Sequence, residues 1–67
     1  MTDVLQTEMR KRMARENGMA TGRRSKLYDD ASMRKAMDRF VASHPDWAQQ
    51  VLDDWRQGWR DAEVHRR

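Results

Sequence analysis

The chain has 67 residues, enough for one domain with a small core, so we expect residues 1–67 to form a single domain. It has no cysteine and only two histidines, which excludes disulfides and argues against a zinc site or another metal centre. Hydrophobic and charged residues each make up 37% of the chain, with one proline and three glycines, and this composition predicts a small all-α bundle of three helices.

No apolar run approaches the roughly 20 residues of a membrane span, so we expect no membrane partner. The N-terminus also lacks the apolar segment of a signal peptide. Together with the absence of cysteine, these features predict a cytoplasmic protein.

Positive charge is concentrated in one stretch of the chain. Residues 10–26 include seven basic side chains and one acid, a net charge of +6, whereas residues 27–67 carry seven basic and eight acidic side chains. Such a stretch suits the phosphates of a nucleic acid or an acidic protein surface.

A first helix is expected over about residues 3–20, with Thr2 as its N-cap. Leu5, Met9 and Met13 recur every four residues and predict the face of this helix that turns to the core.

The end of the first helix has two interpretations. Asn17-Gly18 could cap it, or the helix could run on to a cap at Gly22; we favour the longer helix because residues 19 and 20 continue the apolar stripe. In the longer helix Gly18 and Gly22 lie one turn apart on the side away from the methionines, and Lys11 and Arg15 share that side. Another backbone, of protein or of nucleic acid, could approach such a bare surface closely.

Residues 21–28 are predicted to form a loop that holds three cations in four positions: Arg23, Arg24 and Lys26. Flexible cations of this kind settle readily around phosphate oxygens.

A second helix is expected over about residues 30–42, with Asp29 or Asp30 as its cap. Its apolar positions follow the i, i+3, i+4, i+7, i+8 pattern of a helix packed on one face. They are Met33, Ala36, Met37, Phe40 and Val41. The opposite face, with Arg34, Lys35, Asp38 and Arg39, is interpreted as solvated surface.

A third helix is expected over about residues 45–64, with Ser43 or His44 as cap and Pro45 in its first turn. Its apolar face carries three tryptophans and a glycine, which costs roughly 1 kcal/mol of helix propensity relative to alanine and so indicates close packing. The residues of this face are Trp47, Ala48, Val51, Leu52, Trp55, Gly58, Trp59 and Ala62. We expect the tryptophans to form the core against the methionines of the other helices.

No pattern in the chain predicts an enzyme or a cofactor. His44 and His65 lie near opposite ends of the third helix, and adjacent carboxylates such as Asp53 and Asp54 point about 100° apart on a helix, so neither pair converges on one site.

Two blocks of the chain resemble ribosome modulation factor. Residues 55–62 match that family's closing Trp-x-x-Gly-Trp-Arg-acid-Ala run, with Arg66 four residues further on and Pro45 ten residues before the first tryptophan. Residues 22–26, Gly-Arg-Arg-Ser-Lys, come after Met19-Ala20 and resemble the family's Gly-x-Ala-Gly-Arg-Ser-Lys segment, with one extra residue here. Here 18 residues separate Lys26 from Pro45, where the family has only a few, and they build the second helix.

The resemblance implies a small helical protein that binds ribosomal RNA of the small subunit, blocks initiation and promotes ribosome hibernation in slow growth. By position, Arg23, Arg24 and Lys26 would contact phosphates, and Arg60 would lie at the edge of that contact. Trp55, Gly58 and Trp59 would hold the helices together.

The leading hypothesis is therefore a ribosome-binding or RNA-binding regulator of translation that acts by occupancy. Its candidate RNA contacts are Lys11, Arg15, Arg23, Arg24, Lys26 and Arg60, and its packing motif is Trp55, Gly58, Trp59 and Ala62. The alternatives are a protein-interaction module of the phage or plasmid inhibitor type, which the methionine-rich composition favours, and a DNA-binding homodimer.

Overall fold

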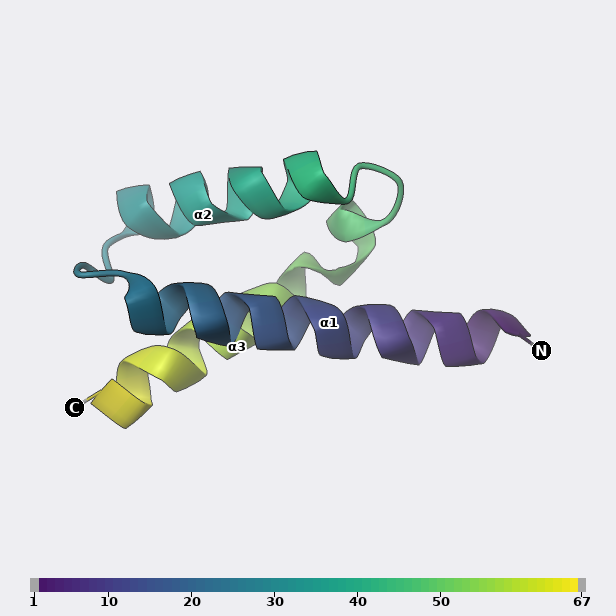
Figure 1. Cartoon of the computed structure of the whole chain (residues 1–67), viewed down its shortest axis with the longest axis horizontal. Coiled ribbons are helices and arrows are strands. Elements are labelled where there is room, and N and C mark those ends of the chain that lie inside the picture. Colours follow the sequence, from purple (N-terminus) through teal and green to yellow (C-terminus); the bar gives the residue numbers. More distant parts are fainter. Residues whose placement is uncertain (1, 67) are drawn as a thin grey trace.

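The computed structural model describes residues 2–66, which form three α-helices and one short 3-10 helix, with no strand among them (Figure 1). The elements are α1 (Thr2–Arg24), α2 (Asp30–Ser43), the 3-10 helix η1 (Ala48–Val51) and α3 (Leu52–Arg66). The predicted all-α fold of three helices is confirmed.

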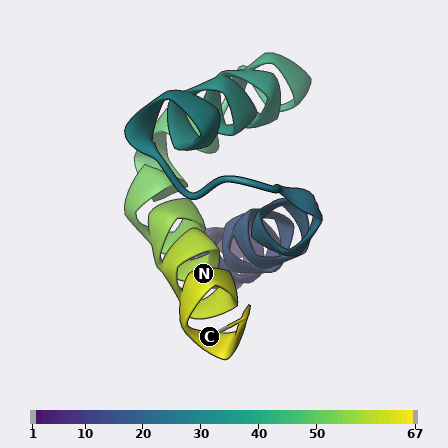
Figure 2. The same ribbon diagram turned by 90° about the vertical axis from the view of Figure 1, so that its left-hand side faces the viewer.

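The helix α3 is the element on which the other two pack. Figure 1 shows α1 crossing α3, with the first turns of α1 extending beyond the rest of the molecule. Viewed along the long axis, α1 and α2 both lie beside α3, and residues 25–29 lead from the first helix to the second (Figure 2).

Glycines bring the backbones of α1 and α3 into direct contact. A methyl group on Gly58 would overlap the carbonyl oxygen of Arg15 and come within 2.9 Å of the backbone nitrogen of Met19. A methyl group on Gly18 would overlap the carbonyl oxygen of Trp55 in the same way. Since only a residue without Cβ permits such an approach, glycine is required on both sides of the crossing.

Small residues make up the buried face of α1. Ala14, Gly18 and Gly22 recur every four residues and are all buried. A Cβ on Gly22 would lie 2.8 Å from the Cβ of Ala62, so the close contact continues to the end of the helix.

The predicted core face of the first helix is wrong. Leu5, Met9 and Met13 are 69%, 61% and 45% exposed. Met9 and Gly18 are nine residues apart and so lie on opposite sides of a helix with 3.6 residues per turn. The interface selects the face that allows the closest backbone approach, and this is the face of small residues rather than the stripe of large apolar ones.

The first helix is also longer than predicted. Gly18 continues it, as favoured, but the cap at Gly22 and the loop over residues 21–24 are wrong, because α1 ends at Arg24. The backbone N–H of Ser25 donates to the carbonyls of Thr21 and Gly22, both at 3.1 Å, and no described residue has a positive φ. The contact of Gly22 with Ala62 holds this last turn in place. The proposed capping role of Thr2 concerns a side chain outside those described.

The second helix begins and ends close to the predicted positions. Asp29 is its N-cap, and its side chain accepts a 2.8 Å hydrogen bond from the backbone N–H of Ser32. Hydrogen bonding from the side chain and backbone of Ser32 lowers the pKa of Asp29 from its usual value. Met37 and Phe40 are buried, as the apolar pattern predicts.

The predicted start of the third helix at Pro45 is wrong. Residues 45–47 form a turn, η1 follows, and α3 begins only at Leu52 and continues to Arg66. His44 ends α2 instead of capping a new helix, and Trp47 precedes η1 without a side-chain cap. The Trp47 ring lies 5.9 Å from Phe40 and 4.7 Å from His44, centroid to centroid, so this packing turns the chain back before α3 can begin.

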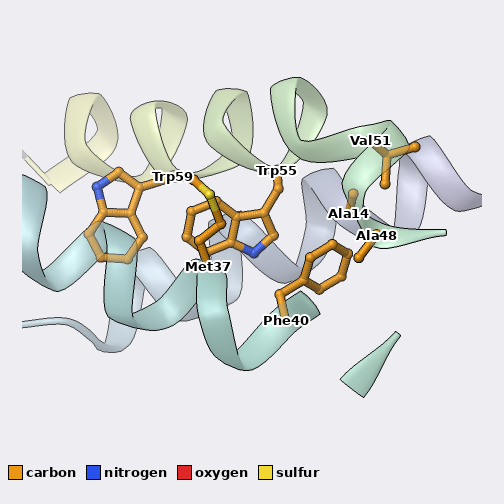
Figure 3. Close-up of a cluster of buried hydrophobic side chains, with 7 residues drawn as sticks. All are labelled: Ala14, Met37, Phe40, Ala48, Val51, Trp55 and Trp59. Atoms are coloured by element: carbon orange, nitrogen blue, oxygen red, sulfur yellow. The ribbon is translucent and has the colours of Figure 1, made fainter. Parts of the chain in front are cut away.

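Aromatic rings join α2 to α3. Figure 3 shows Trp55 and Trp59 pointing from α3 toward α2, where Met37 and Phe40 meet them. The ring centroids of Trp55 and Trp59 are 5.6 Å apart, and those of Phe40 and Trp55 are 6.4 Å apart. Trp55 and Trp59 are core residues, as predicted, whereas Trp47 is only partly buried.

The two interfaces of α3 therefore have different spacings. Glycines allow the backbone of α1 to contact the backbone of α3, whereas the rings of two tryptophans lie between α3 and α2. Because the side chains at a contact set the separation of two helices, α2 stands off from the α1–α3 pair.

Gly58→Ala tests the backbone contact. In an exposed helix this change stabilises by about 1 kcal/mol, but here the new methyl group meets the Arg15 backbone, and we expect a loss of about 2 kcal/mol. For a domain of this size the melting temperature should fall by roughly 10 °C. Arg56→Ala, at an exposed position of the same helix, is the control and should change stability little. A stabilised Gly58→Ala protein would contradict the interface.

Exchange of Gly22 and Ala62 tests the end of the same interface. Gly22→Ala alone should destabilise, because the two Cβ atoms would be 2.8 Å apart. Adding Ala62→Gly removes the clash, so the double variant should be more stable than the sum of the single changes by about 1 kcal/mol in denaturant unfolding. Ala31→Gly, at an exposed position of α2, serves as the control and should simply add to Gly22→Ala.

Candidate nucleic-acid interface

The six predicted RNA contacts are all exposed but do not form one cluster. Four of them lie on α1, and Lys11 is separated from Arg24 by thirteen residues, or about 20 Å along the helix axis. Lys26 lies in the linker after α1, and Arg60 lies on α3. The positive stretch is therefore spread along the length of the molecule.

The middle of α1 is partly neutralised by α3. The Arg15 guanidinium forms an ion pair with Asp61, with Nη2 and Oδ2 3.1 Å apart. Asp61 also accepts a 3.0 Å hydrogen bond from Gln57, and hydrogen bonds from Gln57 and then Arg15 lower its pKa. Lys11 and Arg15 border a depression that also includes Asp54. The backbone that approaches the bare side of α1 is that of α3.

Arg10 also has a partner within the fold. Its guanidinium carbon lies 5.6 Å from the centre of the Trp47 ring, a cation–π distance. This contact links α1 to the turn before η1, where Trp47 is only partly buried.

Arg23 and Arg24 follow each other in the last turn of α1 and so point about 100° apart. Arg24 lines a groove between α1 and α2, whereas Arg23 is not part of its lining. Both cations also lie at the negative end of the helix dipole, which favours positive side chains. The predicted clamp of three cations thus divides between two faces.

The groove between α1 and α2 is a feature that the sequence analysis missed. Its volume is about 580 Å³, and three cations from two helices line it: Arg24, Lys35 and Arg39. Its lining also includes the hydroxyl residues Thr21, Ser25, Ser32 and Ser43, and contains no aspartate or glutamate. The face of α2 interpreted as plain solvated surface therefore forms one wall of a cationic groove.

One signal in the sequence points to this wall. Lys35 and Arg39 are four residues apart, so they lie on the same side of α2, where two like charges disfavour the helix slightly. No ion pair links Lys35, Arg39 or Arg24 to a carboxylate within residues 2–66. The spacing of Lys35 and Arg39 does not predict that α1 places a third cation, Arg24, opposite them.

The position of the groove follows from the core. Phe40 and Trp59 lie in its lining but are only 3% and 2% exposed, so they separate the helices without offering free ring faces. On the α1 side, the Asn17 side-chain oxygen accepts hydrogen bonds from the Trp55 indole at 3.0 Å and from Thr21 at 3.3 Å. These bonds attach one wall of the groove to the core.

Across residues 2–66, histidine, aspartate and glutamate side chains nowhere gather in a group of three that could hold a metal ion. Within the same range, no helix combines the length and the hydropathy needed to cross a membrane.

No significant match to this chain is found among protein-family models, curated proteins or solved structures. The resemblance to ribosome modulation factor therefore depends on the residues of the two blocks alone.

The Arg15–Asp61 ion pair predicts a pH-dependent difference between two proteins. The pKa of Asp61 is lowered in the folded state from its usual 3.8, so its contribution to stability is present above that pH and is lost as the pH falls through the lowered value. The melting temperature of the wild type should exceed that of Asp61→Asn at pH 6, and the difference should shrink below pH 3.8. A difference that stays constant down to pH 2 would contradict this role of the ion pair.

Proposed function

We propose that this chain is a small RNA-binding regulatory protein that acts by occupying a site on ribosomal RNA, as in ribosome hibernation or inhibition of translation. The observation that carries the proposal is the group of exposed cations at the C-terminal end of α1, which presents positive charge on two faces. Arg23, Arg24 and Lys26 are exposed there and form no ion pair with a carboxylate within the described residues.

Charge of this kind favours phosphates over other partners. A protein that neutralises phosphates with lysine and arginine releases bound counterions, and this release drives the association at low salt. Arg23, Arg24 and Lys26 would make the main contacts to RNA phosphates. Lys11 would add a phosphate contact further along α1. Arg15 would contribute less because Asp61 already holds it, and Arg60 would reach the RNA only at an edge.

The resemblance to ribosome modulation factor supports ribosomal RNA as the target. Its two blocks pack directly on each other here, since Gly22 meets Ala62 at the end of the α1–α3 interface. The inserted helix α2 packs on the opposite flank of the tryptophans, so it does not come between the two blocks.

A second function is favoured by one specific observation. The stripe of Leu5, Met9 and Met13 lies exposed on α1, whose first turns extend beyond the other helices (Figure 1). Methionine surfaces adapt to partner grooves, so this stripe would suit a protein-interaction module. Affinity purification that yields one stoichiometric protein partner insensitive to ribonuclease would favour this function over RNA binding.

The double variant Arg23→Glu/Lys26→Glu tests the RNA proposal. Its affinity for structured ribosomal RNA should fall by about tenfold or more, and the slope of log K against log salt should become shallower by about 1.5, because two phosphate contacts are lost. Filter binding or fluorescence anisotropy measures both values, and sucrose-gradient sedimentation tests binding to ribosomes.

Arg34→Glu/Arg56→Glu is the matched control, with the same change of charge at exposed positions outside the cluster. Equal losses in the two double variants would indicate a general charge effect and contradict the assigned contact. Absence of the wild type from every ribosomal fraction at low salt would refute the ribosomal target. Tighter binding to duplex DNA than to structured RNA at matched salt would favour the DNA-binding homodimer instead.

A further inference from the structure

We propose that the groove between α1 and α2 holds one unpaired nucleotide of an RNA strand, gripped mainly by its phosphate between Arg24, Lys35 and Arg39. The inference rests on the proposed function and names the part of the RNA that this surface takes.

The charge of the groove is of one sign. Arg24 enters from the last turn of α1, and Lys35 and Arg39 enter from one side of α2. The nearest carboxylate in sequence is Asp38, which lies outside the groove in a neighbouring depression with Asp30 and Arg34; Lys35 borders both hollows. An anion in the groove would relieve the repulsion among three cations that no carboxylate in the lining offsets.

The size of the groove excludes a double helix and suits one nucleotide. Its volume of about 580 Å³ lies within the roughly 300–1,000 Å³ of pockets that take small ligands. A duplex could touch only the rim of such a groove. A flexible single strand can instead turn one phosphate and its sugar inward, where cations reach it from both walls.

The groove is held open before any ligand binds. Trp59 and Trp55 separate α2 from the α1–α3 pair, and Trp55 is fully buried and hydrogen-bonded to Asn17. The cations therefore face each other without a rearrangement of the helices. A site prepared in this way avoids part of the ordering cost that weakens binding to flexible surfaces.

The walls favour the backbone of the strand over its bases. The Asn17 oxygen is engaged by Trp55 and Thr21, and neither bond uses the two N–H donors of that amide. Ser32 and Ser43 of α2 add hydroxyl groups for phosphate and ribose. Phe40 and Trp59 are almost fully buried, and the partly buried His44 ring already packs on Phe40 and Trp47. Because these rings offer little free face for stacking, we expect little dependence on base identity.

Lys35→Gln/Arg39→Gln tests the site without touching the core, because both side chains are exposed. The probe is a labelled single-stranded oligonucleotide of uridine, compared with one of adenosine and with a duplex RNA. We expect about a tenfold loss of affinity for both single strands and a salt slope shallower by about 1.4, since each phosphate contact contributes about 0.7. Duplex RNA should lose no more than it does with the control.

Arg34→Gln/Arg56→Gln is the matched control, again with two exposed cations removed outside the groove. If the groove variant binds the single strands as tightly as this control, the inference is overturned while the proposed function stands. If the wild type binds neither single-stranded nor structured RNA at low salt, both are overturned.

A mapping experiment on the wild type makes the result independent of any variant. Titration of the isotope-labelled protein with the uridine oligonucleotide should shift the backbone amide signals of Arg24, Ser32, Lys35 and Arg39. Shifts confined to Lys11, Arg23 and Lys26 would place the RNA elsewhere and overturn the site. Uridine monophosphate that binds as tightly as the oligonucleotide would assign the groove to a free nucleotide and overturn RNA as its occupant.

Discussion

The backbones of α1 and α3 meet at two points, where Gly58 faces the carbonyl of Arg15 and Gly18 faces that of Trp55. A chain of this length has little apolar surface to bury, so the closeness of this crossing matters more than the size of the side chains in it. The crossing also determines which side of α1 is available to a partner. Once Ala14, Gly18 and Gly22 pack on α3, the large apolar residues on the opposite side of α1 remain exposed.

The helix α2 depends on that crossing through the tryptophans. Trp55 and Trp59 leave α3 beside Gly58 and meet Met37 and Phe40 of α2 (Figure 3). Small residues on one flank of α3 and large rings on the other make an asymmetric bundle, with two helices in contact and the third held off. The groove between α1 and α2 is a consequence of this asymmetry, because its width is set by rings that belong to the core.

The same geometry sorts the cations by their availability. Arg15 is held by Asp61, and Arg10 lies over Trp47. Arg24, by contrast, stands opposite Lys35 and Arg39 across the groove. Trp55 and Trp59 set the positions of the charged walls and offer almost no ring surface of their own, since they are 0% and 2% exposed. The basic end of α1 and the cationic side of α2 thus face each other across one groove.

Local patterns in the sequence predicted three helices and the concentration of positive charge in residues 10–26. The 3.6-residue pattern around Met37 and Phe40 predicted α2 with its cap at Asp29, and Gly58 on an apolar face predicted a close approach, because both signals are local. Only the tertiary structure decided which face of α1 is buried, since Leu5, Met9 and Met13 offer a regular stripe that no neighbour covers. It also decided the late start of α3, which follows from the packing of Trp47 on Phe40. The cationic groove also depends on the tertiary structure. The distance between Arg24 and the cations of α2 is set by a core residue, Trp59, which carries no charge.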